Sequence, residues 1–351
     1  MQKSTHTRSD QSAHRIGYFD SMRGLSMILV VLGHIYLFAD PETNDLSTPT
    51  AILMSFRMPL FFGISGFFAY RTLQHWSAAL MKQTTIRKLR AQILCATVFY
   101  MLYQVTQHGD VLGFTHSGYG FFWFTIALFQ MFVIYMMVVM LCKSFHKDYS
   151  GLILALLALP AVYLSYHPTD YQIDVVLSWS KVTRYFPYFT IGVIIRQYWN
   201  WFERLLHSDW FVTLTITVFF LGCIYCYTDG YHYPTNFIDH LFQNQIHRAT
   251  GLLTVIIFFH SRARYFDGSS SVARFLRFTG KRTLDIYMMH IFFVPHLNVL
   301  SWVNTLNLPE LMIIKLALCM AIAVAITALC LLLSNMLRSS HFLSVWLFGT
   351  K

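Results

Sequence analysis

Apolar stretches of bilayer-spanning length follow one another along most of this chain. A helix needs about 20 mostly apolar residues to cross about 30 Å of hydrocarbon. Ten stretches meet this requirement: 16–39, 51–70, 91–107, 120–142, 150–166, 181–198, 209–227, 244–260, 284–303 and 310–337. The stretches are continuously apolar rather than alternating, which argues against a membrane β-barrel. The sequence therefore predicts an all-α, polytopic integral membrane protein with ten transmembrane helices.

The composition agrees with this class of protein. Of 351 residues, 56% are hydrophobic and only 12% are charged, whereas soluble domains carry about 25% charged residues. A net charge of +10 would suit nucleic-acid binding, but the basic residues lie between apolar stretches rather than on one exposed face. We therefore expect membrane lipids as partners and no nucleic acid. The six cysteines fall within apolar stretches, so we expect neither a disulfide framework nor a metal site.

The loops between these helices alternate in charge. Lys and Arg gather in one set of loops and in both terminal segments, 1–15 and 338–351. The other set has no Lys or Arg and comprises 40–50, 108–119, 167–180, 228–243 and 304–309. Because basic loops stay in the cytoplasm, the pattern places both termini there. We expect a single membrane domain over 16–337 between two cytoplasmic tails, without a cleaved signal peptide.

Besides Arg196, which is counted with the basic loop after the sixth helix, six basic residues fall inside the predicted helices, where a charge costs about 2.5–3.5 kcal/mol at mid-membrane. They are Arg23, Arg57, Lys181, Arg184, Arg248 and Lys315. The two lysines lie near helix ends, from which their amines can reach the membrane interface. The four arginines either pair with buried acids or carbonyls and fix helix packing, or they serve a function.

The first predicted helix carries Arg23 and His34, eleven residues apart. At about 100° per residue this spacing returns to nearly the same face, with about 16 Å between the two positions along the axis. With the N-terminus inside, Arg23 lies in the cytoplasmic half and His34 in the outer half. Asp20 can pair with Arg23 three residues later. The helix face thus presents a cation and a titratable base, although a lone membrane histidine also occurs as a packing residue.

Two later segments carry further polar groups. Residues 55–66 contain Arg57. They also contain Ser65 together with two glycines, and such small residues permit close helix approach. The loop after this helix ends on three basic residues: Arg87, Lys88 and Arg90. Such a cluster anchors topology, and it would also suit the phosphates of a ligand at the cytoplasmic face.

Taken in order, these motifs resemble the membrane-bound acyltransferase family 3, whose members O-acylate glycans. The family's first helix has an arginine, ten residues and a histidine, which Arg23 and His34 match. Four later stretches are similar to its other motifs: Phe56 to Gly66 in the second helix, Trp123-Phe124 in the fourth, Tyr185-Phe186-Pro187 in the sixth, and Tyr287-x-x-His290 in the ninth. The sequence of the second motif is most similar to that of the fucose 4-O-acetylase-like enzymes. In this chain, however, Arg57 stands where that subgroup has a histidine.

The resemblance implies an O-acyltransferase, in particular an O-acetyltransferase. It would move an acyl group from cytoplasmic acetyl-CoA to a sugar hydroxyl of an extracytoplasmic or lipid-linked glycan, in the cytoplasmic membrane of a bacterium. His34 would be the general base, and Arg23 its catalytic partner, either binding the donor or stabilising the transition state. CoA phosphates would be held by Arg87, Lys88 and Arg90, with no tightly bound cofactor. Supporting or substrate-contacting roles would fall to Asp20, Arg57, Ser65, Trp123, Tyr287 and His290.

Three alternatives stay open from the sequence. His290, which the topology places in the inner half of the ninth helix, competes with His34 as the base. Whether transfer passes through a covalent intermediate is open, and no Gly-x-Ser-x-Gly motif marks a serine nucleophile. Buried arginines and His34 would also suit a non-catalytic transporter of glycans or lipid-linked sugars, although the chain has no evident internal repeat of the transporter kind.

Overall fold

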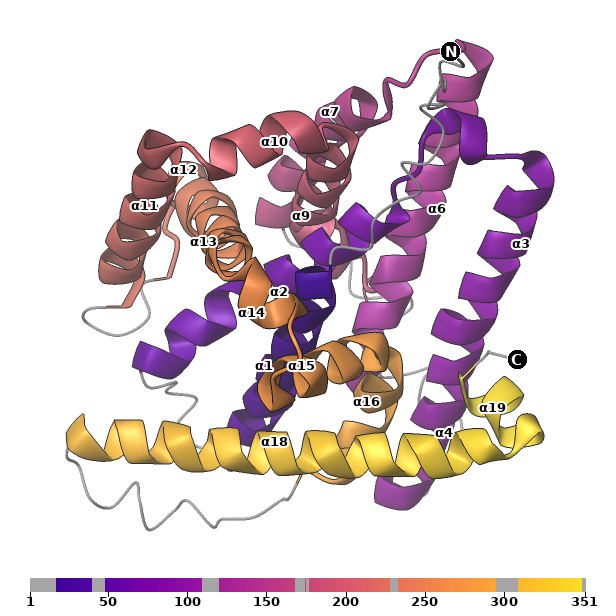
Figure 1. Ribbon diagram of the computed structural model, residues 1–351, viewed down its shortest axis with the longest axis vertical. Coiled ribbons are helices and arrows are strands. Elements are labelled where there is room, and N and C mark those ends of the chain that lie inside the picture. The colour runs from indigo at the N-terminus through magenta and orange to yellow at the C-terminus, as the bar shows by residue number, and fades with distance from the viewer. Residues whose placement is uncertain are drawn as a thin grey trace, which may run out of the picture.

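The computed structural model describes residues 17–39, 48–108, 120–167, 174, 177–227, 233–294 and 309–348. Every regular element in these ranges is a helix, which confirms the all-α prediction. Figure 1 shows the helices packed at many different tilts, with the long helix α18 (Pro309–Ser339) running across the others.

Each of the ten predicted stretches contains a helix, and the ninth is only partly covered because 295–303 lie outside the described residues. The helices are α1 (Gly17–Ala39), α2 (Thr48–Ala69), α4 (Cys95–His108), α6 (Trp123–Ser144), α7 (Ser150–Tyr166), α9 (Trp179–Gln197), α11 (Asp209–Tyr227), α13 (Arg248–Ser261), α16 (Thr283–Met289) and α18. Within the described ranges, four helical segments are long and apolar enough to cross a membrane: Pro49–Ala69, Gly120–Ser144, Asp209–Tyr227 and Ile313–Ser339. The full set of ten spans stays a prediction.

The two long basic segments that the sequence assigns to loops are themselves largely helical. Segment 71–90 contains α3 (Ala78–Lys88), which continues through the π-helix η2 (Leu89–Leu94) directly into α4. Segment 261–283 contains α14 (Ala263–Asp267) and α15 (Ser271–Lys281). The shorter elements are η1 (Leu73–His75), η3 (Gly120–Phe122), α10 (Trp199–Leu206), α12 (Phe237–Leu241), the π-helix η4 (Phe242–His247), η5 (His290–Phe292) and α19 (His341–Phe348). The last of these lies in the predicted C-terminal tail.

Glycines permit close approach of two helix backbones at two crossings in the bundle. A Cβ atom at Gly192 on α9 would overlap the carbonyl oxygen of Gly63 on α2. Where α15 crosses α1, a Cβ atom at Gly280 would overlap the carbonyl oxygen of Asp20, and one at Gly24 would overlap that of Leu276. Small residues permit this approach of two backbones, as at many membrane helix interfaces. The second crossing holds α15 against the first turns of α1 and thereby sets where α16 begins.

The loop charges predict that 228–243 lies outside the cell and 261–283 lies in the cytoplasm. Thr235 and Ser269 are exposed in the structure, so a cysteine at either position would be accessible to a reagent on its own side. All six native cysteines are buried, which keeps background labelling low. On intact cells, we expect an impermeant thiol reagent to label Thr235→Cys and to leave Ser269→Cys unlabelled until the cells are lysed. The reverse result would overturn the orientation.

Candidate active site

The face of α1 that carries Arg23 and His34 packs against α16. The Arg23 Nη2 atom donates to Thr283 Oγ1 at 3.0 Å, and His34 Nδ1 lies 2.8 Å from His290 Nε2 in η5, directly after α16. Thr283 and His290 are seven positions apart in the sequence, which is about two helical turns. Both α1 side chains therefore lie on one helix face, each against the same neighbouring segment.

The His34–His290 contact changes the relation that the topology predicts between the two rings. The sequence places them at different depths and treats them as rivals for one role. In the structure their ring centroids are 4.9 Å apart. The reason is tertiary: α15 is held against the start of α1, so α16 begins beside Arg23 and brings His290 alongside His34. The predicted separation of the two histidines in depth was therefore wrong, and the two rings form a hydrogen-bonded pair.

The hydrogen bonds of His290 assign the protons of both rings. His290 Nδ1 lies 3.0 Å from the carbonyl oxygen of Ile286, and because a carbonyl only accepts, Nδ1 carries the proton. In the neutral ring His290 Nε2 is then an acceptor, so the hydrogen bond must come from His34 Nδ1–H. Neither hydrogen bond uses the lone pair of His34 Nε2. This is the tautomer that a general base requires, and it is fixed by a neighbouring side chain.

Arg57 approaches this pair from α2. Its guanidinium occupies the space beside Gly33, where any Cβ atom would overlap Nη1. Nη1 also lies 3.4 Å and 3.5 Å from the carbonyl oxygens of Leu29 and Val30, to which it donates. The positive charge of Arg57 acts on both His34 and His290. Arg57, to which the resemblance gives a supporting or substrate-contacting role, therefore lies close to the histidine pair.

Aromatic residues hold the start of α6 beside the histidine pair. The Tyr287 hydroxyl donates to the carbonyl oxygen of Phe121 at 2.5 Å and accepts from the backbone N–H of Phe124 at 3.2 Å. The Phe121 ring in turn meets the His34 ring edge to face, with centroids 5.5 Å apart. Trp123 stacks on Tyr185 of α9 at 5.7 Å. Tyr287 therefore fixes the segment that carries Phe121 beside His34, and Trp123 packs against α9.

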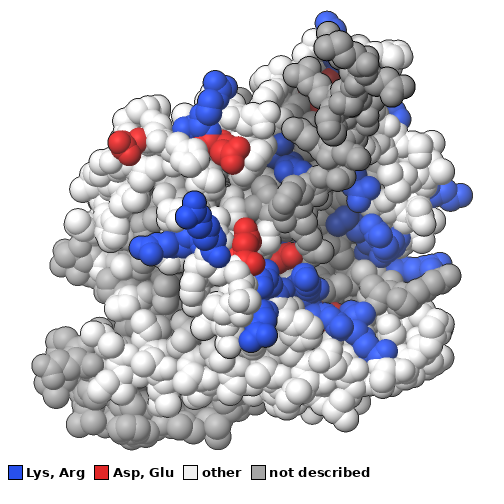
Figure 2. Space-filling view, in the orientation of Figure 1, with Lys and Arg blue, Asp and Glu red and all other residues white. Residues whose placement is uncertain are grey.

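On the side assigned to the cytoplasm, basic side chains gather around Arg23. Figure 2 shows Lys and Arg side chains clustered over α14, α15 and the neighbouring part of α3. Lys88 is half-buried, its amine 4.4 Å from the Phe132 ring centroid. Burial, together with the positive charges of Arg23, Arg87 and Arg71, lowers the pKa of Lys88 to about 8. Arg87 and Arg90 are exposed, whereas Lys88 is half-buried and close enough to Arg23 for that charge to act on it.

Two predicted supporting residues have local structural contacts. The Asp20 side chain is 1% exposed, and its backbone carbonyl forms the close crossing with Gly280. Ser65 donates to the carbonyl oxygen of Phe61 within α2 at 2.8 Å. Neither contact brings its side chain to the histidine pair.

The sequence analysis missed a buried acid that anchors α16. Asp285 is 2% exposed and accepts from Arg338 Nη2 of α18 at 2.7 Å. Arg282 Nη1 lies 3.3 Å from the same carboxylate, and Ser334 donates to it. An acid inside an apolar stretch is costly unless it is paired. The position of Asp285 within the ninth stretch was the signal that could have found it.

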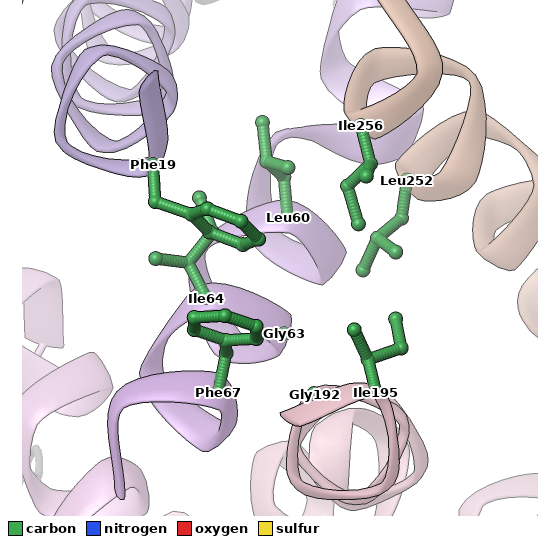
Figure 3. A pocket seen from close by; sticks show the side chains of 9 residues that line it. All are labelled: Phe19, Leu60, Gly63, Ile64, Phe67, Gly192, Ile195, Leu252 and Ile256. Carbon is green, nitrogen blue, oxygen red and sulfur yellow. The ribbon is translucent and has the colours of Figure 1, made fainter. Parts of the chain in front are cut away.

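A small apolar cavity lies among α1, α2, α9 and α13 (Figure 3). Its lining is apolar: Phe19, Leu60, Gly63, Ile64, Phe67, Gly192, Ile195, Leu252 and Ile256. Gly63 and Gly192 from the α2–α9 crossing face it, without side chains to fill the space. With no polar group on its wall, this cavity offers nothing to orient a substrate.

Comparison with known protein families gives one match. A family model described as an acyltransferase domain matches residues 16–332. No curated protein and no solved structure matches the chain. The matched range covers most of the chain and includes the motifs from Arg23 to His290. The chain therefore belongs to the membrane-bound acyltransferase family 3, as its motifs indicate, and is a membrane acyltransferase.

Proposed function

We propose that this protein is an O-acetyltransferase that moves an acetyl group from cytoplasmic acetyl-CoA to a sugar hydroxyl of an extracytoplasmic or lipid-linked glycan. The observation that carries the proposal is the contact between His34 and His290, which leaves His34 Nε2 unprotonated and held in place. The acyltransferase family supplies the reaction class. A bacterial cytoplasmic membrane is the location that we propose for it.

The proposed reaction uses His34 as the general base. Its Nε2 atom takes the proton of the acceptor hydroxyl while the hydroxyl oxygen attacks the carbonyl carbon of the thioester. The tetrahedral oxyanion then collapses, the C–S bond breaks, and the CoA thiolate leaves with the proton that His34 carried. The guanidinium of Arg57 on α2 lies beside Gly33, the residue that precedes His34 on α1. It supplies the positive charge that stabilises the oxyanion.

Donor binding is proposed at the basic cluster around Arg23. Arg23 lies eleven residues before His34 on one face of α1, about 16 Å away along the axis. With its phosphates held by Lys88 and Arg23, the extended arm of CoA would run along α1 and bring the thioester to His34. Arg87 and Arg90, both exposed, would add positive potential at the entrance. Acetyl-CoA is a substrate in this scheme, not a resident cofactor.

Purified protein with acetyl-labelled CoA and an isolated surface glycan fraction tests the proposal. We expect the label to move to the glycan and free CoA thiol to appear in equal amount. Mass spectrometry of surface glycans from cells with and without the protein would then identify the modified hydroxyl. Glycan movement across the membrane without thioester cleavage would support the transporter alternative instead.

The lowered pKa of Lys88 gives a pH prediction for donor binding. Below about pH 8 the Lys88 amine is charged and binds phosphate, and above it the charge is lost. We therefore expect kcat/KM for acetyl-CoA to fall as pH rises through about 8, and Lys88→Gln to lower kcat/KM at pH 7 and remove this pH dependence. Arg87→Gln, at the exposed neighbour, is the matched control: it should keep the fall, with the midpoint displaced to higher pH because the charge of Arg87 helps to lower the pKa of Lys88. A Lys88→Gln enzyme with the unaltered profile would exclude Lys88 from the donor site.

A further inference from the structure

A second polar region lies between α9 and the continuous helix formed by α12, η4 and α13. The Tyr188 hydroxyl of α9 donates to the carbonyl oxygen of Asn244 in η4. The Asn244 amide nitrogen lies 3.3 Å from His240 Nδ1, and His240 Nε2 lies 3.0 Å from Ser165 Oγ of α7. These contacts fix polar groups of three helices against one another, at the end of the bundle that the loop charges assign to the outside.

Three arginines extend this region inward to the histidine pair. Arg184 lies one turn before Tyr188 on α9, and Arg248 follows Asn244 by four residues. The charges of Arg184 and Arg248 both act on His240 and Tyr188. Arg248 also acts on Arg57, which acts on His34. A line of positive charge, the arginine track (Arg184, Arg248 and Arg57), therefore runs from His240 to the proposed base.

Within the described part of the chain, the first and last members of the track, Arg184 and Arg57, have no carboxylate partner. The buried Nε atom of Arg184 has no hydrogen-bond partner there either. The adjoining π-helix η4 adds Gln245, 7% exposed, whose amide oxygen and nitrogen are both unpartnered among the described residues. Cations in an apolar bundle repel one another and favour an anion between them, and π-helical segments often occur at functional sites.

We propose that the outer end of the arginine track, at Arg184, binds the acceptor through an anionic group, a carboxylate or a phosphate, and so presents a neighbouring hydroxyl to His34 beside Arg57. This inference rests on the proposed acetyl transfer. Guanidinium groups bind both kinds of anion through paired hydrogen bonds. The acceptor is then an acidic sugar or a sugar phosphate, rather than a neutral glycan. The amide of Gln245 is suited to the hydroxyl groups of the same ligand.

Binding to the purified full-length protein without acetyl-CoA tests the track independently of catalysis. The probes are methyl glucuronide, glucose 1-phosphate and methyl glucoside, which carry a carboxylate, a phosphate and no charge. By isothermal titration we expect one of the anionic probes to bind at least about tenfold more tightly than the neutral one. The better of the two anions tells an acidic sugar from a sugar phosphate. Equal binding of all three probes would overturn the proposal.

Two variants locate the binding site. Arg184→Gln should remove most of the preference for the anion, whereas Arg196→Gln, at the opposite end of α9 beside Phe67, should retain it. An unchanged preference for the anion in Arg184→Gln would contradict the assignment. Displacement of the bound anion by CoA would also contradict it, because the track would then be part of the donor site. Absence of acetyl transfer to any acceptor would refute the proposed function, but it would leave the anion preference and its loss in Arg184→Gln measurable.

Discussion

Replacing His34 by alanine is expected to lower kcat for acetyl transfer by about 10²- to 10⁴-fold, the usual contribution of a general base. The variant removes the only ring nitrogen of the pair that the hydrogen bonds leave free to accept a proton. His290 Nδ1 is committed to the Ile286 carbonyl and its Nε2 to His34. KM for acetyl-CoA should stay close to that of the native enzyme, because the donor site that we propose for the phosphates lies at the other end of α1.

Substitutions of His290 separate its role from that of His34. His290→Gln keeps a side-chain oxygen that can accept from His34 Nδ1–H, and it should retain more activity than His290→Ala, which leaves the tautomer of His34 unspecified. Both should lower kcat less than His34→Ala and leave the acetyl-CoA KM unchanged. If His34→Ala kept substantial turnover while both His290 variants lost it, the base would be His290.

The local part of this site could be predicted from the sequence because helical periodicity is local. An interval of eleven residues fixes Arg23 and His34 on one face of α1 in any α-helix, and both indeed contact the α16 segment. The apolar stretches likewise mark where helices form. Such predictions need only the rise and the rotation per residue, and no knowledge of which helices pack together.

The partners across helices could not be predicted in this way. His290 reaches His34 because α15 crosses α1 at Gly24 and Gly280, a tertiary contact between residues about 250 positions apart in the chain. Loop charge identified 261–283 as a basic segment, but charge alone does not distinguish an irregular loop from helices that pack against the transmembrane helices. Arg57 was noted as a departure from the family pattern, yet its place beside Gly33 depends on the α1–α2 packing.

Replacing Asp285 by asparagine is expected to lower the free energy of unfolding by about 3–5 kcal/mol, the cost of breaking a buried ion pair by removing one partner. The asparagine keeps the shape of the side chain and a contact to Ser334. It leaves Arg338 and Arg282, which are only 21% and 27% exposed, without their carboxylate. Thermal or denaturant unfolding of the purified protein in detergent measures the loss. Asp209→Asn, at an exposed acid on α11, is the control and should change stability little.

A double-mutant cycle shows whether the effect comes from the ion pair or from packing alone. Arg338→Gln by itself should destabilise less than Asp285→Asn, because Asp285 keeps Arg282 and Ser334 as partners. If the charges interact directly, the double variant will be more stable than the sum of the single losses predicts, by about 0.5–3 kcal/mol. Additive losses would mean that each side chain acts through its own packing. Since Asp285 also fixes the helix that carries Tyr287 and leads to His290, the residual activity of Asp285→Asn should fall in kcat rather than in the KM for acetyl-CoA.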